Sequence, residues 1–197
     1  MINNYIVMDL ELNHSNNRYV SERNGIRLAN EIVEIGAVKL DSDLKETDRY
    51  CRFVKPSAYA KMNGEVKELT EITTDMIQSG LPFPEAAKEF LAWCGEDSAF
   101  VTWSENDINM MEDNLLYHGL PIEGLPRCFD IQPLFGDLIM DEDRSYALSY
   151  ALWKLDITPE PSHDALNDAL NTAEVMRVLC RDEDGGNDLG ILEDYEI

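Results

Sequence analysis

The stretch Ile6-Val7-Met8-Asp9-Leu10-Glu11-Leu12 decides the fold, because it carries two acids inside an otherwise apolar segment. Apolar and polar residues alternate toward its end, which predicts a strand with Asp9 and Glu11 on one face and apolar side chains on the other. A carboxylate in an apolar segment is costly unless something cationic compensates it. The pair therefore points to a bound cation, although the solvent face of an edge strand would give the same pattern.

Length and composition predict one folded domain. The chain has 197 residues, of which 44% are apolar and 9% aromatic, enough for a substantial core. We expect residues 1–180 to form this domain and residues 181–197, with one arginine and seven acids, to form an acidic, mobile tail. No apolar run approaches the roughly 20 residues of a membrane helix, and the N-terminus lacks the basic lead of a secretory signal. Four cysteines without a CxxC pair favour a reducing, cytoplasmic setting.

The remaining pattern predicts an α/β fold with a mixed sheet. Strands are expected at residues 4–12, 31–41, 48–55 and 98–103, with a long polar loop at 13–30. Helices are expected at residues 73–80, 84–94, 104–118, 130–140, 145–155 and 164–180.

Three further residues suited to metal or acid–base chemistry are Asp107, His163 and Asp168. Four acids without a lysine or arginine among them suit Mg²⁺ or Mn²⁺, and a neutral histidine beside them can act as a general base near pH 7. Alternate strand residues lie roughly 7 Å apart along the chain. Asp9 and Glu11 can therefore share two ions about 3.5–4 Å apart, the arrangement of two-metal phosphodiester cleavage.

Each of these residues also has a purely structural interpretation. Ser104-x-x-Asp107 matches a capping box, so Asp107 alone is equally well explained as a helix-start acid. His163 alone could be a surface residue at a helix entry, and Asp168 alone a solvated helix acid. The functional interpretation depends on their occurring together and in order.

The net charge of −23 disfavours binding to a long duplex, because affinity for phosphate backbones usually comes from lysine and arginine. Residues 1–70 hold 10 of the 16 basic residues and 11 acids, whereas residues 71–197 hold 6 and 28. We therefore expect a short single-stranded end to approach the N-terminal third. Arg18, Arg23 and Arg27 in the 13–30 loop are either phosphate contacts or solvated loop residues.

The motifs resemble those of the DEDDh (DnaQ-like) 3′→5′ exonucleases. Asp9-Leu10-Glu11 matches the first motif, Asn106-Asp107 the second, and His163 with Asp168-Ala169 the third. Residues 69–77 resemble the Leu-Thr-Gly-Ile-Thr stretch of these enzymes, with Glu71 replacing glycine, and residues 30–37 resemble their second strand. The resemblance spans residues 4–180 and is greatest to the enhanced-RNAi and KapD-like branch.

This resemblance implies an RNase H-like fold, with a mixed five-stranded sheet flanked by helices, and two Mg²⁺ or Mn²⁺ ions. It assigns four metal ligands (Asp9, Glu11, Asp107 and Asp168), the base His163, and four residues near the substrate (Leu12, Asn13, Ile72 and Trp103), of which the last two are equally well explained as core. The implied activity releases nucleoside 5′-monophosphates from the 3′ end of single-stranded RNA, or of DNA. Two alternatives stay open: a proofreading subunit beside a polymerase, and a regulatory module that binds nucleic acid or a protein partner. The acidic tail is a candidate partner contact.

Overall fold

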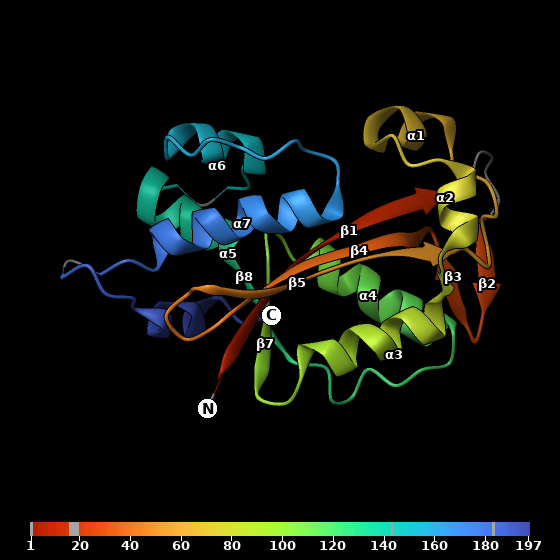
Figure 1. Cartoon of the computed structure of the whole chain (residues 1–197), viewed down its shortest axis with the longest axis horizontal. Helices are drawn as coiled ribbons and strands as arrows, with labels where there is room; N and C mark the ends of the chain where they lie inside the picture. The colour runs from red at the N-terminus through yellow and green to blue at the C-terminus, as the bar shows by residue number, and fades with distance from the viewer. Residues whose placement is uncertain (1, 16–19, 143, 183) are drawn as a thin grey trace.

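The protein is built around one mixed sheet (Figure 1). The structure, a computed structural model, describes residues 2–15, 20–142, 144–182 and 184–197; Arg18 lies outside this described part. The sheet has the strand order β6-β5-β4-β1-β7-β8. The strands are β1 (Asn4–His14), β4 (Asn30–Leu40), β5 (Glu46–Lys55), β6 (Leu81–Pro82), β7 (Ser98–Thr102) and β8 (Arg127–Asp130). Within the described chain the sheet thus has six strands, so the predicted number of five is wrong.

The strand that carries the first two acids lies in the middle of the sheet. β1 pairs antiparallel with β4 and parallel with β7. β5 continues the antiparallel meander beyond β4, while β8 adds a parallel strand beyond β7. An interior strand is covered on both faces, so the edge-strand alternative for Asp9 and Glu11 is wrong.

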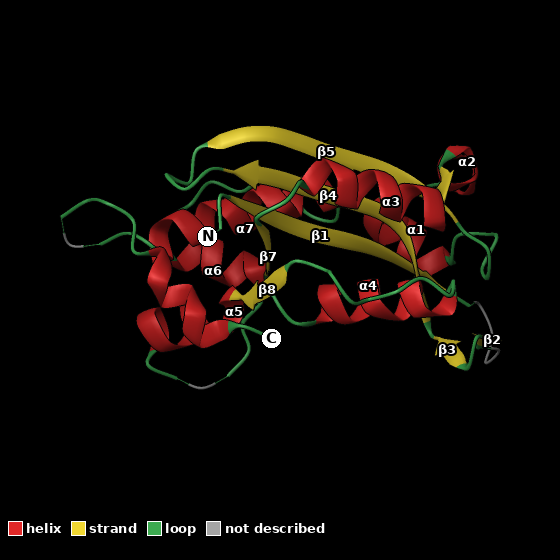
Figure 2. Cartoon of the chain, turned by 90° about the horizontal axis from the view of Figure 1, so that it is seen from below, coloured by secondary structure: helices red, strands yellow, loops and turns green. Residues whose placement is uncertain are grey.

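Helices cover both faces of this sheet, as Figures 1 and 2 show. The helices α3 (Phe83–Cys94) and α4 (Asn106–Tyr117) lie on one face, and α5 (Ile131–Phe135), α6 (Leu148–Lys154) and α7 (Ala165–Leu179) on the other. Val7 belongs to the core cluster that contains Met176 of α7, whereas its neighbour Met8 belongs to the cluster that contains Phe90 of α3. The alternation predicted for the first strand is therefore confirmed, and it places Asp9 and Glu11 on the α7 face.

Gly36 lets the start of α7 rest directly on the sheet. It pairs in register with Asp9. A Cβ atom at this position would lie 2.1 Å from the carbonyl carbon of Ala165 and 2.2 Å from the backbone nitrogen of Leu166. Because only glycine permits this approach, Gly36 brings the first turn of α7 next to Asp9.

Most predicted helices are present, and several short elements were not predicted. Besides the helices above, α2 (Thr74–Ser79) begins at its N-cap Thr73, as expected. The helix predicted at residues 130–140 is present as α5 followed by the π-helix η1 (Gly136–Met140). The structure adds α1 (Gly64–Thr70) and a hairpin of β2 (Ser21–Arg23) and β3 (Ile26–Leu28). The hairpin replaces part of the predicted 13–30 loop. Asn24 and Gly25 at its tip both have positive φ, which is the signature of a two-residue type I′ turn.

The C-terminal segment, expected as a mobile tail, packs against the domain. It forms the 3₁₀ helix η2 (Leu189–Tyr195), in which Leu192 is completely buried. Arg127 of β8 pairs with Glu193 at 2.7 Å and also with Glu196. The backbone N–H of Ile197 donates to the carbonyl oxygen of Cys128 at 3.0 Å. In the described residues the packed domain therefore extends beyond residue 180. Along the same part of the chain, no helix is both long and apolar enough to cross a membrane.

Candidate active site

Three of the predicted metal ligands come together at the centre of the α7 face. Asp9 and Glu11 project from β1, and Asp168 lies in the first turn of α7. One carboxylate oxygen of each lies within 4.8 Å of the others, and all three side chains are half-buried. Hard oxygen donors at this spacing suit Mg²⁺ or Mn²⁺. Asp9 and Asp168 are almost 160 residues apart in the sequence, and the packing of α7 on the sheet brings them together.

Asp107 lies beside this group at the start of α4. Its Oδ1 accepts a hydrogen bond from the backbone N–H of Leu10 at 3.2 Å, and its side chain lines the same cleft as Asp9 and Asp168. The N-cap of α4 is Glu105, without a side-chain capping bond, and Ser104 Oγ accepts from Asn106 N instead. Asp107 thus bonds to the metal-site strand, and the capping-box alternative does not describe it.

The start of α7 fixes the carboxylate of Asp168. Asp164 caps the helix by accepting from the N–H of Asn167 at 3.0 Å. The backbone N–H of His163 donates to Asp168 Oδ2 at 2.8 Å, and Asn171 Nδ2 donates to Oδ1 at 3.3 Å. Both oxygens are therefore oriented by neighbours before any ion binds.

Asn171 was not recognised in the sequence. It is 2% exposed and exchanges two hydrogen bonds with the backbone of Glu160, at 2.8 and 3.2 Å. The same side chain thus joins Asp168 to the loop that precedes α7. The signal available in the sequence was its position three residues after Asp168, on the same side of the helix.

His163 lies at the wall of a cleft of about 850 Å³ that also contains Asp9, Asp107 and Asp168. Its side chain is exposed, and its backbone is left-handed with φ of 65°. Few non-glycine residues adopt this conformation, although histidine is among the more tolerant. This conformation directs the backbone N–H to Asp168 while the imidazole stays in contact with the cleft. The position is compatible with proton transfer in the cleft.

Each acid of the cluster makes ionisation of its neighbours less favourable. Burial, and then the nearby carboxylates, raise the pKa of Asp9 well above its usual range. Burial, followed by Asp168 and Glu34, raises the pKa of Glu11 to about 8. Burial is also the main reason that the pKa of Asp107 rises to about 7. A divalent cation would supply the missing positive charge, so the donor set fits such an ion.

Glu34 is a further acid that the sequence analysis did not assign to the site. It is 2% exposed on β4 and pairs in register with Glu11, beside the register shift at which Val33 of β4 has no partner in β1. Its carboxylate accepts from Cys51 Sγ at 3.3 Å and from the N–H of Ala165 at 3.4 Å. Burial raises its pKa. The signal in the sequence was an acid within an apolar strand, the same signal that identified Asp9 and Glu11.

The four predicted substrate contacts have different surroundings. Asn13 is completely buried: its amide donates to the carbonyl oxygens of Tyr59 and Lys61. Ile72 is 3% exposed in a core cluster with Val33, Met62 and Ile77. Both side chains therefore have structural partners, and their contact with a nucleotide stays a prediction. Leu12 is half-buried, and Trp103 is buried but lines the cleft.

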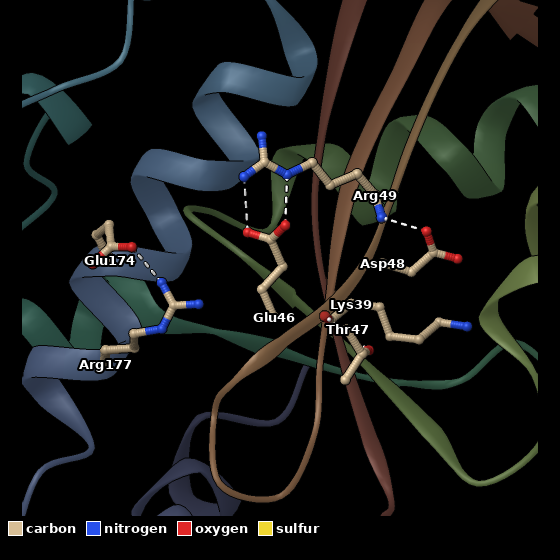
Figure 3. A network of polar contacts seen from close by, with 7 residues as sticks. All are labelled: Lys39, Glu46, Thr47, Asp48, Arg49, Glu174 and Arg177. Carbon is tan, nitrogen blue, oxygen red and sulfur yellow. Dashed lines mark hydrogen bonds and ion pairs between the residues drawn. The ribbon is translucent and has the colours of Figure 1, made fainter.

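Among the residues that the structure describes, no lysine or arginine lines this cleft. Its described lining residues include Asp156 and Glu160 in addition to the acids above. Figure 3 shows two arginines near the other end of α7 that are already paired, Arg49 with Glu46 and Arg177 with Glu174. Phosphate groups entering the cleft would therefore depend on bound cations.

The comparison with known families identifies the chain. A model of the RNase T type, described as exonuclease, matches residues 6–176. The chain belongs to this exonuclease family. The acidic cluster of Asp9, Glu11 and Asp168 is consistent with a divalent-metal site in a member of this family.

The sequence relatives of this exonuclease are DNA polymerases. It is 31% identical over 146 residues to the DNA polymerase III PolC-type of Thermotoga maritima and 28% identical over 173 residues to that of Clostridium perfringens. These matches cover 74% and 88% of the chain. The chain spans only 10% and 11% of the length of these curated relatives.

Solved structures share the exonuclease's fold. The nuclease domain of 3′hExo, a DEDDh family member bound to rAMP, superposes with a TM-score of 0.76 at 19% identity, covering 88% of this chain and 90% of that one. E. coli exonuclease I in complex with a dA16 oligonucleotide gives a TM-score of 0.65 at 12% identity, covering 88% and 40%. The predicted RNase H-like exonuclease fold is thereby confirmed.

Proposed function

We propose that this exonuclease hydrolyses phosphodiester bonds at the 3′ end of single-stranded nucleic acid, with RNA favoured over DNA, and releases nucleoside 5′-monophosphates. The observation that carries the proposal is the meeting of Asp9, Glu11 and Asp168 within 4.8 Å. Asp107 and His163 line the cleft into which Asp9 and Asp168 open. Five residues dispersed over the chain thus converge on one place, as a reaction at a single phosphate requires.

The residues divide into ligands, a base and orienting groups. Asp9, Glu11, Asp107 and Asp168 would hold two Mg²⁺ or Mn²⁺ ions, which lower the pKa of a water molecule and stabilise the leaving oxygen when bound. His163 accepts the proton of the attacking water as the oxygen–phosphorus bond forms and the bond from phosphorus to the 3′ oxygen breaks. Asn171 and the N–H of His163 keep Asp168 in place.

The charge of the protein supports a single-stranded end as the substrate. A duplex binder neutralises many phosphates with lysine and arginine, whereas the net charge here is −23. Among the solved structures of similar fold, exonuclease I was crystallised with a dA16 oligonucleotide, and a 3′-exonuclease is described as recognising the 3′ end of a histone mRNA stem-loop. Motif spacing is the basis for placing the chain in the enhanced-RNAi and KapD-like branch.

Proofreading beside a polymerase is the second candidate, and the sequence relatives favour it. Each of the relatives described above is a DNA polymerase III of the PolC type. In this alternative the substrate would be a mismatched 3′ end of DNA presented by a polymerase.

One substrate panel tests both candidates. Purified protein with Mg²⁺ or Mn²⁺ is incubated with 5′-labelled single-stranded RNA, single-stranded DNA and a DNA primer–template with a mismatched 3′ end. We expect stepwise shortening of RNA from the 3′ end, inhibition by a chelator, and no activity of Asp9→Ala. Preference for the mismatched primer would favour proofreading. Binding without shortening, or equal activity of Asp9→Ala and parent, would contradict the proposed function and favour a regulatory binding module.

We further propose a cytoplasmic location and a role for the acidic C-terminal segment in contacting a protein partner. The four cysteines are free thiols, which agrees with a reducing compartment. Exposed acids in the segment, including Asp184 and Asp188, provide the charge for such a contact.

A further inference from the structure

We propose that Trp153 is a stacking platform on which a nucleobase of the substrate lies while its phosphate is held at the acidic cluster. The inference rests on the proposed function and names a residue that determines substrate affinity.

Trp153 exposes a large aromatic surface inside the cleft. Its side chain is 71% exposed, and it lines the cleft together with Asp9, Asp107 and Asp168. Its neighbours on α6, Ala151 and Leu152, are instead buried in the hydrophobic core between the sheet and α7. The indole therefore does not belong to the packed face of α6.

A series of ring contacts connects Trp153 to the core. The rings of Trp103 and Phe135 lie 5.7 Å apart, those of Phe135 and Tyr146 5.4 Å, those of Tyr146 and Tyr150 5.4 Å, and those of Tyr150 and Trp153 5.5 Å. Four members of the series contact the core, and Trp103 Nε1 donates to the carbonyl oxygen of Tyr146 at 3.0 Å. A ring supported in this way loses little conformational entropy when a base stacks on it.

Because the cleft is acidic, base stacking is the main contact that its side chains can offer a nucleic-acid substrate. The described lining carries five acids and neither lysine nor arginine, while Leu148, Ile157 and two prolines add apolar surface. The described lining therefore offers phosphate groups no permanently cationic side chain. Base–aromatic stacking does not depend on charge and accepts any base, so it suits a nuclease that must move along a strand.

Isolated exposed apolar residues are common on protein surfaces and require no function. The other large ones in the described chain are Leu69, Leu138, Val178 and Ile197. None of these four lines the cleft, whereas Trp153 does. Its position beside the acids is what distinguishes it.

The test compares Trp153→Ala, Trp153→Phe and the control Val178→Ala. Shortening of a 5′-labelled RNA oligonucleotide by the full chain is measured with Mg²⁺, in parallel with shortening of a wholly abasic sugar–phosphate oligonucleotide, a diester without a base. Binding of the same oligonucleotide is measured by fluorescence anisotropy with Ca²⁺ in place of Mg²⁺. The binding measurement stays informative even if the oligonucleotide is not cleaved.

We expect Trp153→Ala to weaken oligonucleotide binding and raise KM about tenfold, within the range that base–aromatic stacking supplies, with kcat changed less than about twofold. Trp153→Phe should keep most of the parent's affinity for the oligonucleotide, and Val178→Ala should bind as tightly as the parent. Hydrolysis of the base-free diester should be unchanged in all three. Unchanged oligonucleotide binding by Trp153→Ala, or an equal loss on the base-free diester, would overturn the inference. If the parent binds the oligonucleotide through Trp153 but does not shorten it, the proposed function fails and the platform stands.

Discussion

Replacement of Glu11 by glutamine should stabilise the metal-free protein at alkaline pH. Burial and the neighbouring carboxylates raise the pKa of Glu11 from 4.5 to about 8. The folded state therefore holds the proton more tightly than the unfolded chain. Stability falls as the pH rises from the unfolded pKa to the folded one and levels off above it. The substitution Glu11→Gln removes this charge and keeps the shape of the side chain.

The expected size of this effect follows from the same pKa. A pKa shift of one unit corresponds to about 1.4 kcal/mol. The shift of Glu11 therefore sets an upper limit of about 5 kcal/mol on the change in the free energy of unfolding. Water reaches the half-buried carboxylate and neighbouring acids share the protons, so we expect about 2 kcal/mol at pH 8.5 and less than about 0.5 kcal/mol at pH 4.5.

Urea unfolding of parent and Glu11→Gln, in chelator at both pH values, measures this difference. Addition of Mg²⁺ at pH 8.5 should then stabilise the parent more than the variant, because only the parent keeps the full ligand set. If Glu11→Gln is no more stable than the parent at pH 8.5, or if the difference is the same at both pH values, then the carboxylate of Glu11 does not destabilise the metal-free fold.

Three further substitutions test parts of the site. His163→Asn, chosen because asparagine tolerates the left-handed backbone, should lower kcat by roughly 10²–10⁴-fold with the free energy of unfolding nearly unchanged; activity within a factor of two would exclude His163 as the base. Gly36→Ala should destabilise the fold by about 1–3 kcal/mol and lower activity, because the new methyl group meets the backbone of α7. Gly64→Ala is the control, since Gly64 has open space around it. Equal stability of the two variants would contradict the close approach of α7 to Gly36. Asn171→Ala should raise the Mg²⁺ concentration for half-maximal activity about 10–100-fold, and an unchanged metal requirement would show that Asn171 does not position Asp168.

Local patterns were sufficient to predict the centre of the fold. The alternation around Asp9 and Glu11 identified both the strand and the face that carries the acids, because side-chain direction in a strand follows directly from sequence parity. The helix that carries Asp168 was predicted to within a residue at each end. These features depend on neighbouring residues only.

Features that depend on distant contacts were missed. Glu34 reaches the site through its register with Glu11, and no local pattern specifies that register. The packing of the C-terminal segment depends on Arg127, which lies more than sixty residues before its partners. The hairpin within the predicted 13–30 loop was also missed, although its signal was local. Asn24-Gly25 is a turn signal that outweighs the polar composition around it.

Diffraction from crystals soaked in Mn²⁺, recorded near the manganese absorption edge, tests the central claim most directly. We expect anomalous peaks within about 2.2 Å of carboxylate oxygens of Asp9, Glu11 and Asp168 in the parent, and their loss in Asp9→Asn. Fully occupied manganese elsewhere with none at these oxygens, or identical peaks in the variant, would contradict the assignment of the metal site.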